Sequence, residues 1–273
     1  MKFKAIFVLF NITLIFACAF IVLMPIIVLD EAFSAVYLAR SWPLVAFFAL
    51  LLAGFDVFFA MNWKLFTLLE AERWQELAAL LGTAVFDSGR LDRRTIRLLV
   101  NTSLLLGDTD TVQRLEALLR DKKPEALRRD AALFGAARLL RNDPAASVAF
   151  LAEYAGAQGV ERPGWVSFQY GFSLILDGRA AEATSTLAAT AGSREPVLAL
   201  LSAYLLGTLC ARSVPASERD ALVARADSVR TAIAARYGRG RWEREVNSAK
   251  SEVHIVIVSR LLDEAGRWME ERA

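Results

Sequence analysis

Three helix-breaking dipeptides recur at a fixed interval along the middle of the chain. Gly107-Asp108, Asn142-Asp143 and Asp177-Gly178 begin 35 residues apart. Each follows an apolar run with helical spacing and precedes an amphipathic one. A regular break at about this interval is typical of stacked helix–turn–helix units, in which each unit needs its neighbour to bury its apolar face. The spacing therefore predicts an all-α chain that offers an extended surface.

The same interval extends in both directions, to Glu72 and to Arg212, where polar segments again separate apolar runs. It predicts about five helical hairpins over residues 63–238. The prolines support this division, because Pro is favoured in the first turn of a helix. Five of them fall at expected helix starts: Pro124, Pro144, Pro163, Pro196 and Pro215. Only Pro25 is expected inside a helix, and the alternative architecture is an irregular helical bundle with an accidental spacing.

The fourth hairpin carries a more specific pattern of residues. A large residue precedes a glycine, a second glycine lies at the turn, a small residue follows, and a core leucine and a proline complete the unit: Tyr170-Gly171, Gly178, Ala183, Leu187 and Pro196. This segment resembles the tetratricopeptide repeat family, although the family's Trp is displaced to Trp165 and its period is about 34 residues. The other units keep the turn and the periodicity but lack this signature. The resemblance implies an α-solenoid in which the first helix of each unit lines a concave, protein-binding groove.

Two long apolar stretches occupy the amino-terminal part of the chain. Residues 5–29 contain no ionisable side chain except Cys18, and residues 43–62 contain only Asp56. Each reaches the roughly 20 residues that a helix needs to cross a bilayer. The sequence predicts a transmembrane hairpin of these two spans, joined by a loop at 30–42. A cleaved signal peptide or lipoprotein signal is the alternative, but the first stretch is longer than a signal core of about 7–15 residues.

The basic residues near these spans predict their orientation. Lys2 and Lys4 precede the first span, whereas the loop between the spans offers only Arg40. A larger group follows the second span: Lys64, Arg73, Arg90, Arg93 and Arg94. Because basic residues favour the cytoplasmic side, both termini and the repeat domain are expected in the cytoplasm, with the chain in the cytoplasmic membrane. Two cysteines without a plausible disulfide mate fit that reducing compartment.

Two polar residues lie at about the same depth in the expected hairpin. Asp56 is the one carboxylate within the spans, and Asn11 comes level with it if the helices are antiparallel. This placement predicts a hydrogen bond between Asn11 and Asp56. An ion or proton site is one interpretation, since ionisable groups in membranes often mark pathways. A structural contact or a handle for a partner is the other, and the absence of a second ionisable group favours it.

The last 35 residues differ from the repeats. Residues 239–273 are predicted to form a single amphipathic helix that caps the last hairpin. Its apolar stripe contains Val246, Ala249, Val253, Ile257, Leu261, Ala265 and Trp268. A helical dimerisation element is the alternative role for this segment.

The sequence offers no chemistry typical of an enzyme. One histidine and two scattered cysteines cannot make an ordinary zinc site, and no glycine-rich phosphate loop follows a strand. We therefore expect no catalytic residue, no metal, no cofactor and no small-molecule substrate. The formal net charge of +2 gives no case for nucleic acid.

A protein-binding groove is the remaining expectation. Arg97 and Asn101 lie one helical turn apart on a first helix, resembling positions that grip peptide carboxylates in some tetratricopeptide relatives. Arg129 and Gln169 would extend this lining over the next two units, and the alternative is that all four are ordinary surface residues. The leading hypothesis is a membrane-anchored cytoplasmic scaffold that binds another protein. The second hypothesis is an accessory or regulatory subunit of a membrane transport or secretion complex, in contact with its partner through the hairpin.

Overall fold

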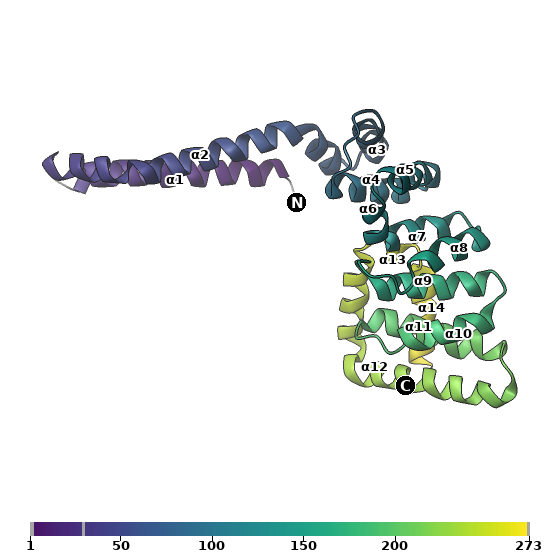
Figure 1. Cartoon of the computed structure of the whole chain (residues 1–273). Helices are drawn as coiled ribbons and strands as arrows, with labels where there is room; N and C mark the ends of the chain where they lie inside the picture. Colours follow the sequence, from purple (N-terminus) through teal and green to yellow (C-terminus); the bar gives the residue numbers. More distant parts are fainter. Residues whose placement is uncertain (1–2, 29–30, 272–273) are drawn as a thin grey trace. The chain divides into compact units, whose positions relative to one another are not determined.

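The computed structural model describes residues 3–28 and 31–271, and helices connected by short turns make up these ranges, which contain no strand (Figure 1). The chain divides into two compact units, Met1–Leu80 and Leu81–Ala273. The all-α prediction is confirmed for the part of the chain that the structure describes.

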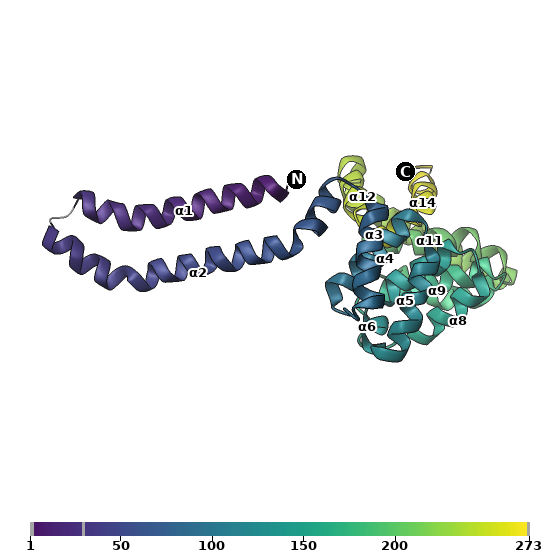
Figure 2. The same ribbon diagram turned by 90° about the horizontal axis from the view of Figure 1, so that it is seen from above.

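The first unit is a pair of long helices, α1 (Phe3–Val28) and α2 (Glu31–Glu70), which lie side by side in both views (Figures 1 and 2). The start of α3 (Trp74–Gly82) belongs to the same unit. Aromatic rings join α1 to α2: the ring centroids of Phe7 and Phe59 are 4.6 Å apart, and those of Phe10 and Phe55 are 4.1 Å apart. We call these four rings the aromatic seam.

Both helices are long and apolar enough to cross a membrane, over Ala5–Met24 and Ala39–Glu70. Almost none of the side chains in these stretches is buried. A core helix of a soluble protein buries most of its apolar side chains, so these two helices do not form a core within this chain.

The expected loop at 30–42 is wrong for the residues that are described, because α2 already begins at Glu31 and contains Pro43 in its interior. Proline removes one helical hydrogen bond, but this cost does not end a helix when the flanking residues favour one. The residues before Pro43 include several good helix formers and no glycine. Helix α2 also extends beyond the second span and runs without a break to Glu70.

The second unit contains the remaining helices. In chain order they are a π-helical turn (Thr83–Asp87), α4 (Arg93–Leu106), α5 (Thr109–Lys122), α6 (Pro124–Arg129), α7 (Ala131–Leu140), α8 (Pro144–Tyr154), α9 (Pro163–Leu176), α10 (Ala180–Thr190), α11 (Pro196–Thr208), a 3₁₀ turn (Cys210–Arg212), α12 (Ala216–Lys250), α13 (Val253–Val256) and α14 (Ser259–Glu270). From α7 to α12 each helix contacts the next one, and α7 also contacts α9, as α9 contacts α11. Figure 1 shows these helices in successive layers.

The predicted breaks are helix ends with a left-handed residue. Glu72, Gly107, Asn142 and Gly178 have φ angles of 53°, 70°, 55° and 77°. Gly107 ends α4 with a pair of backbone bonds, from Gly107 N to Leu104 O (3.1 Å) and from Asp108 N to Ser103 O (2.8 Å). This is the Schellman arrangement, which satisfies the last carbonyls of a helix, and the bonds at Glu72 and Gly178 repeat it. The break near residue 212 differs, because it is the 3₁₀ turn.

Local caps and a dense core complete the second unit. The side chains of Asp92, Asp108 and Asp143 accept hydrogen bonds from backbone N–H groups at the starts of α4, α5 and α8, as N-caps do. Trp165 and Phe168 of α9 are 2% and 0% exposed and lie edge to face at 5.8 Å. The hydrophobic stripes that the sequence shows are therefore buried between neighbouring helices.

The single helix expected over 239–273 is wrong. Helix α12 runs through the expected boundary at 238 to Lys250, and the rest of the segment divides into α13 and α14. The β-branched residues between 253 and 258 explain the break, because such side chains lose rotamer freedom in a helix. α12 packs along α11, and α14 contacts both, whereas α13 contacts α4, α7 and α12.

Candidate functional site

A carboxylate surrounded by arginines joins α4 to the segment that precedes α9. Arg93 Nη2 donates to both carboxylate oxygens of Glu161, at 2.5 and 2.6 Å. Arg97 Nη1 donates to Glu161 Oε2 at 3.4 Å, and Glu161 N donates to the carbonyl of Arg129 at 3.0 Å. Arg93 and Arg97 reach the same carboxylate because they lie one turn apart on α4.

A second, buried carboxylate brings two of the predicted groove residues together. Asp130 is 4% exposed and lies between α6 and α7. Arg129 donates to its Oδ2 from Nη2 at 2.9 Å and from Nε at 3.2 Å, and Arg97 Nε lies 3.7 Å from its Oδ1. A buried charge needs such pairing, because removal from water is costly. Asp130 and Glu161 thus position Arg97 and Arg129 on one surface.

The charges of this cluster act on one another. Partial burial opposes the charged form of Glu161, but the hydrogen bond from Arg93 and the charges of Arg97, Arg93 and Arg129 outweigh it and lower the pKa of this carboxyl. Glu161 is therefore ionised at neutral pH. We call Arg93, Arg97, Arg129 and Arg162, together with the faces of α4 and α7 that they flank, the arginine surface.

The other two predicted groove residues lie differently. Gln169 is 2% exposed, and its Nε2 donates to the carbonyl of Ala132 at 3.0 Å, so it lies between α9 and α7 and lines no groove. Gly135 makes this possible, since a Cβ there would lie 2.5 Å from Gln169 Oε1. The 35-residue interval carries the signal that could have shown this, because Leu99 and Phe134 occupy the corresponding positions and both are fully buried. Asn101 is partly buried on α4.

The carboxy-terminal segment reaches the arginine surface. Arg162 Nη2 lies 2.5 Å from Glu252 Oε1, and α13 contacts α4 and α7 directly after this pair. Ile255 and Val258 are 2% and 4% exposed. Neither Glu252 nor Glu161 follows from the local sequence pattern, since each meets its arginines across 64 or more residues of chain.

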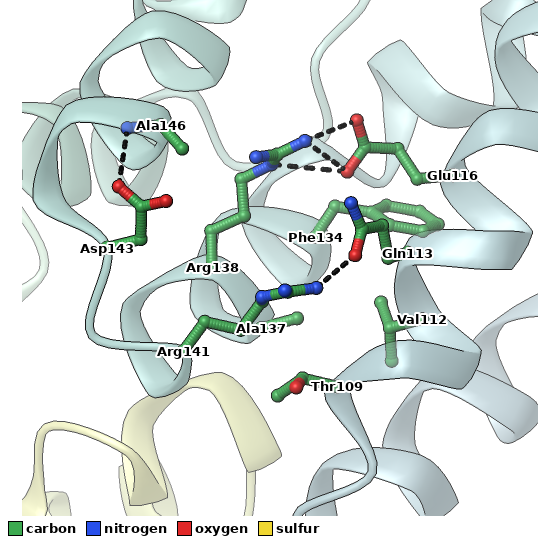
Figure 3. A pocket seen from close by; sticks show the side chains of 10 residues that line it. All are labelled: Thr109, Val112, Gln113, Glu116, Phe134, Ala137, Arg138, Arg141, Asp143 and Ala146. Atoms are coloured by element: carbon green, nitrogen blue, oxygen red, sulfur yellow. Dashed lines mark hydrogen bonds and ion pairs between the residues drawn. The ribbon is translucent and has the colours of Figure 1, made fainter.

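A small pocket lies elsewhere in the second unit, between α5, α7 and α8 (Figure 3). Its volume is about 80 Å³. Arg138 spans it to Glu116 with bonds of 2.8 to 3.2 Å, and Arg141 donates to Gln113 (Figure 3). No group of three or more His, Cys, Asp or Glu side chains within the described ranges could hold a metal ion.

In the hairpin, the expected bond between Asn11 and Asp56 is not formed. Asn11 Nδ2 donates to the carbonyl of Phe7 at 3.0 Å, one turn back on its own helix, as short polar side chains in helices often do. Asp56 Oδ1 is buried and accepts no hydrogen bond from any described residue. The two residues are level as expected, since their sequence neighbours Phe10 and Phe55 are in ring contact.

Comparison with known proteins places the chain in a family. Residues 111–271 match the family model described as "Uncharacterised Treponema protein". The chain is also 30% identical over 278 residues to a protein of Treponema pallidum (strain Nichols) that bears the name "Uncharacterized protein", with 98% of this chain and 88% of that protein covered. The chain belongs to this family. No solved structure matches it.

The extent of these matches bears on the site. The family model includes Arg129, Asp130, Glu161, Arg162 and Glu252, but begins after Arg93 and Arg97. The alignment with the Treponema pallidum relative covers nearly the whole chain and therefore includes most of the hairpin as well. This chain and that relative therefore align along both units.

Proposed function

We propose that this family member is a membrane-anchored scaffold whose helical unit binds another protein at the arginine surface. In this proposal α1 and α2 cross the cytoplasmic membrane as a hairpin, and both termini lie in the cytoplasm. The outward-facing apolar side chains of both helices support the first point, and the basic residues that flank them support the second.

The observation that carries the proposal is the recurrence of left-handed helix ends at Glu72, Gly107, Asn142 and Gly178. Left-handed helix ends at intervals of 35, 35 and 36 residues support a tetratricopeptide-like solenoid. Gly171 adds support, because a Cβ there would lie 2.8 Å from Leu187 Cγ. Helices α9 and α10 therefore approach each other closely at this glycine, as the tetratricopeptide pattern implies. Solenoids of this kind present extended binding surfaces and rarely catalytic sites.

The arginine surface is the part of the helical unit best suited to a protein ligand. It places four guanidinium groups near three carboxylates, and every one of these arginines keeps at least 30% of its side chain exposed. Arginine is favoured in protein interfaces because its planar group binds carboxylates through two parallel hydrogen bonds. The partner proposed here is therefore a protein that offers acidic groups.

The test is affinity capture of the full-length protein from detergent-solubilised membranes, with partners quantified by mass spectrometry. Arg97→Glu should reduce the captured partner at least about tenfold, as expected when a charged contact in an interface is reversed. Arg179→Glu is the matched control, since Arg179 is similarly exposed and its ion pairs among the described residues are with Asp177 and Glu182 at the start of α10. Unaltered capture by Arg97→Glu would remove the arginine surface from the proposal.

A second function has one observation in its favour, the buried Asp56 Oδ1, which accepts no hydrogen bond within the described ranges. A carboxylate in a transmembrane helix is costly unless it is paired, so a basic group on a partner's span would complete this site. The chain would then be an accessory subunit of a membrane complex that is held through the hairpin. In the same capture experiment, this function requires that Asp56→Asn loses the partner while Arg97→Glu retains it.

A further inference from the structure

The segment between α12 and α14 has a geometry of its own. Backbone bonds run from Ile255 N to Glu252 O at 2.9 Å and from Val258 N to Ile255 O at 3.0 Å. These bonds flank the single α-helical turn of α13 (Val253–Val256), and side chains three residues apart on such a turn are neighbours on its surface. Glu252, Ile255 and Val258 therefore form one row, with a carboxylate followed by two branched aliphatic side chains.

This row is turned towards the arginine surface. Glu252 pairs with Arg162, and α13 packs on α4 and α7, the two helices that flank Arg97, Arg129 and Asp130. Ile255 and Val258 are almost completely buried. The chain thus supplies an acidic-then-apolar segment to the surface that would bind a partner's acidic group.

The attachment of this row is weaker than that of its neighbours. Arg162 and Glu252 keep 38% and 34% of their side chains exposed, and ion pairs of that kind contribute little stability. α13 has four residues, too few to be a stable helix in isolation. In contrast, α12 packs along α11, and α14 contacts both of them, with Leu262 and Ala265 of α14 buried. Release of the row would expose Ile255 and Val258 and would leave the contacts of α12 and α14 with α11 intact.

We propose that residues 252–258 are an internal ligand of the arginine surface and that the partner binds through a segment of the same chemistry. That segment carries a carboxylate for Arg162 and branched aliphatic side chains three and six positions later, and it displaces the row when it binds. This inference rests on the proposed function, since it assigns the partner of the same surface. It also makes the resting protein self-occupied.

The probe is a fluorescein-labelled synthetic peptide of residues 250–259, titrated with the full-length protein in detergent micelles and followed by fluorescence anisotropy. In the wild type the internal row competes with the peptide. Ile255→Asp together with Val258→Asp should unseat the row and tighten peptide binding at least about tenfold, because apparent affinity is reduced by the fraction of sites that are occupied internally. Adding Arg162→Glu to this variant should weaken the binding again by at least about tenfold.

The controls separate a specific site from general adhesion. Arg260→Glu changes a residue of α14 whose side chain is 94% exposed, and it should bind the peptide as the wild type does. A peptide with Glu252 replaced by Gln and with Ser at positions 255 and 258 should not bind the unseated variant. If that variant keeps its helical circular dichroism and binds the native peptide no better than the wild type, α13 is a fixed part of the fold and the inference is overturned.

Hydrogen exchange decides the case in which the unseated variant does not fold. A saturating amount of the native peptide, added to the wild-type protein, should accelerate amide exchange in residues 252–258 and leave α11 unchanged. Unaltered exchange in that segment would overturn the inference. The proposed function would survive this result if Arg97→Glu still lost the captured partner, so the two failures can be told apart.

Discussion

Large apolar side chains are exposed in the hairpin and buried in the helical unit. In the hairpin, Phe16 and Leu50 are 70% and 74% exposed, whereas Phe168 and Leu99 of the helical unit are fully buried. The residue types match, so the difference lies in the surroundings for which each unit is suited. The helical unit hides apolar surface from water, and exposed apolar surface on the scale of the hairpin is avoided in soluble monomers.

The contacts within each unit follow the same division. The hairpin is held by its aromatic seam, and few of its side chains are enclosed by the protein. The helical unit instead combines a dense apolar core with ion pairs between helices that are distant in sequence, as at Asp130 and Glu161. Helices in lipid associate through packing, interhelical hydrogen bonds and lipid entropy, because lipid is as apolar as their side chains, whereas helices in water are driven together by burial.

The strongest way to break this comparison is to remove the same side chain from each unit. Phe168→Ala should lower the free energy of unfolding of the helical unit by about 3–5 kcal/mol, since it deletes a buried ring and leaves a cavity. Phe16→Ala, the matched change in the hairpin, should alter it by less than about 0.5 kcal/mol. Hydrogen exchange of the α9 amides in the full-length protein measures both. Similar losses for the two variants would mean that the hairpin is not independent of the helical core.

The amino-acid sequence was informative where structure depends on neighbouring residues. The helix ends at Gly107, Asn142 and Gly178 were predictable because glycine and asparagine tolerate the left-handed conformation that a Schellman end requires. The start of α2 was not predictable from the position of Pro43, because the helix formers around this proline keep the helix intact. The break after Lys250 was not predicted either, because the apolar stripe continues through the run of β-branched residues that follows.

The candidate site was predictable only in part. Arg97 and Arg129 could be selected as polar residues near the first helices, but Glu161 reaches Arg97, and Glu252 reaches Arg162, only through the fold. Polar residues are usually expected at the surface. Gln169 is an exception, because its buried side-chain amide donates to a backbone carbonyl of α7. Long-range pairing of this kind leaves no periodic signal in one sequence.

A medium-sized difference in stability between the units should appear when one glycine of each unit is replaced by alanine. Gly171→Ala would place a Cβ 2.8 Å from Leu187 Cγ, so overpacking should cost about 1–3 kcal/mol. Gly54→Ala in the hairpin meets nothing within 4 Å and should cost nothing, because alanine favours helix more than glycine does. Thermal unfolding followed by circular dichroism in detergent compares the two variants.

The cause of the Gly171 effect can be checked with a second substitution. Leu187→Ala removes the side chain that the new methyl group would strike. Gly171→Ala should therefore cost less in the Leu187→Ala background than in the wild type, which is the coupling expected of residues in contact. Additive losses would show that close approach of α9 and α10 is not the reason for the glycine.

The smallest effect concerns charge, which the helical unit uses between helices. The pKa of Glu161 is lowered from its ordinary value of 4.5, because the arginines around it outweigh its partial burial. Folding therefore favours the ionised form, and the stability this contributes is complete above pH 4.5 and is lost as the pH falls through the lowered pKa. Glu161→Gln should remove that part of the pH dependence, by less than about 1 kcal/mol because the ion pairs are half exposed and screened. Unfolding free energies of the two proteins between pH 3 and 7 provide the measurement. Equal slopes would show that the arginines do not stabilise the ionised carboxylate.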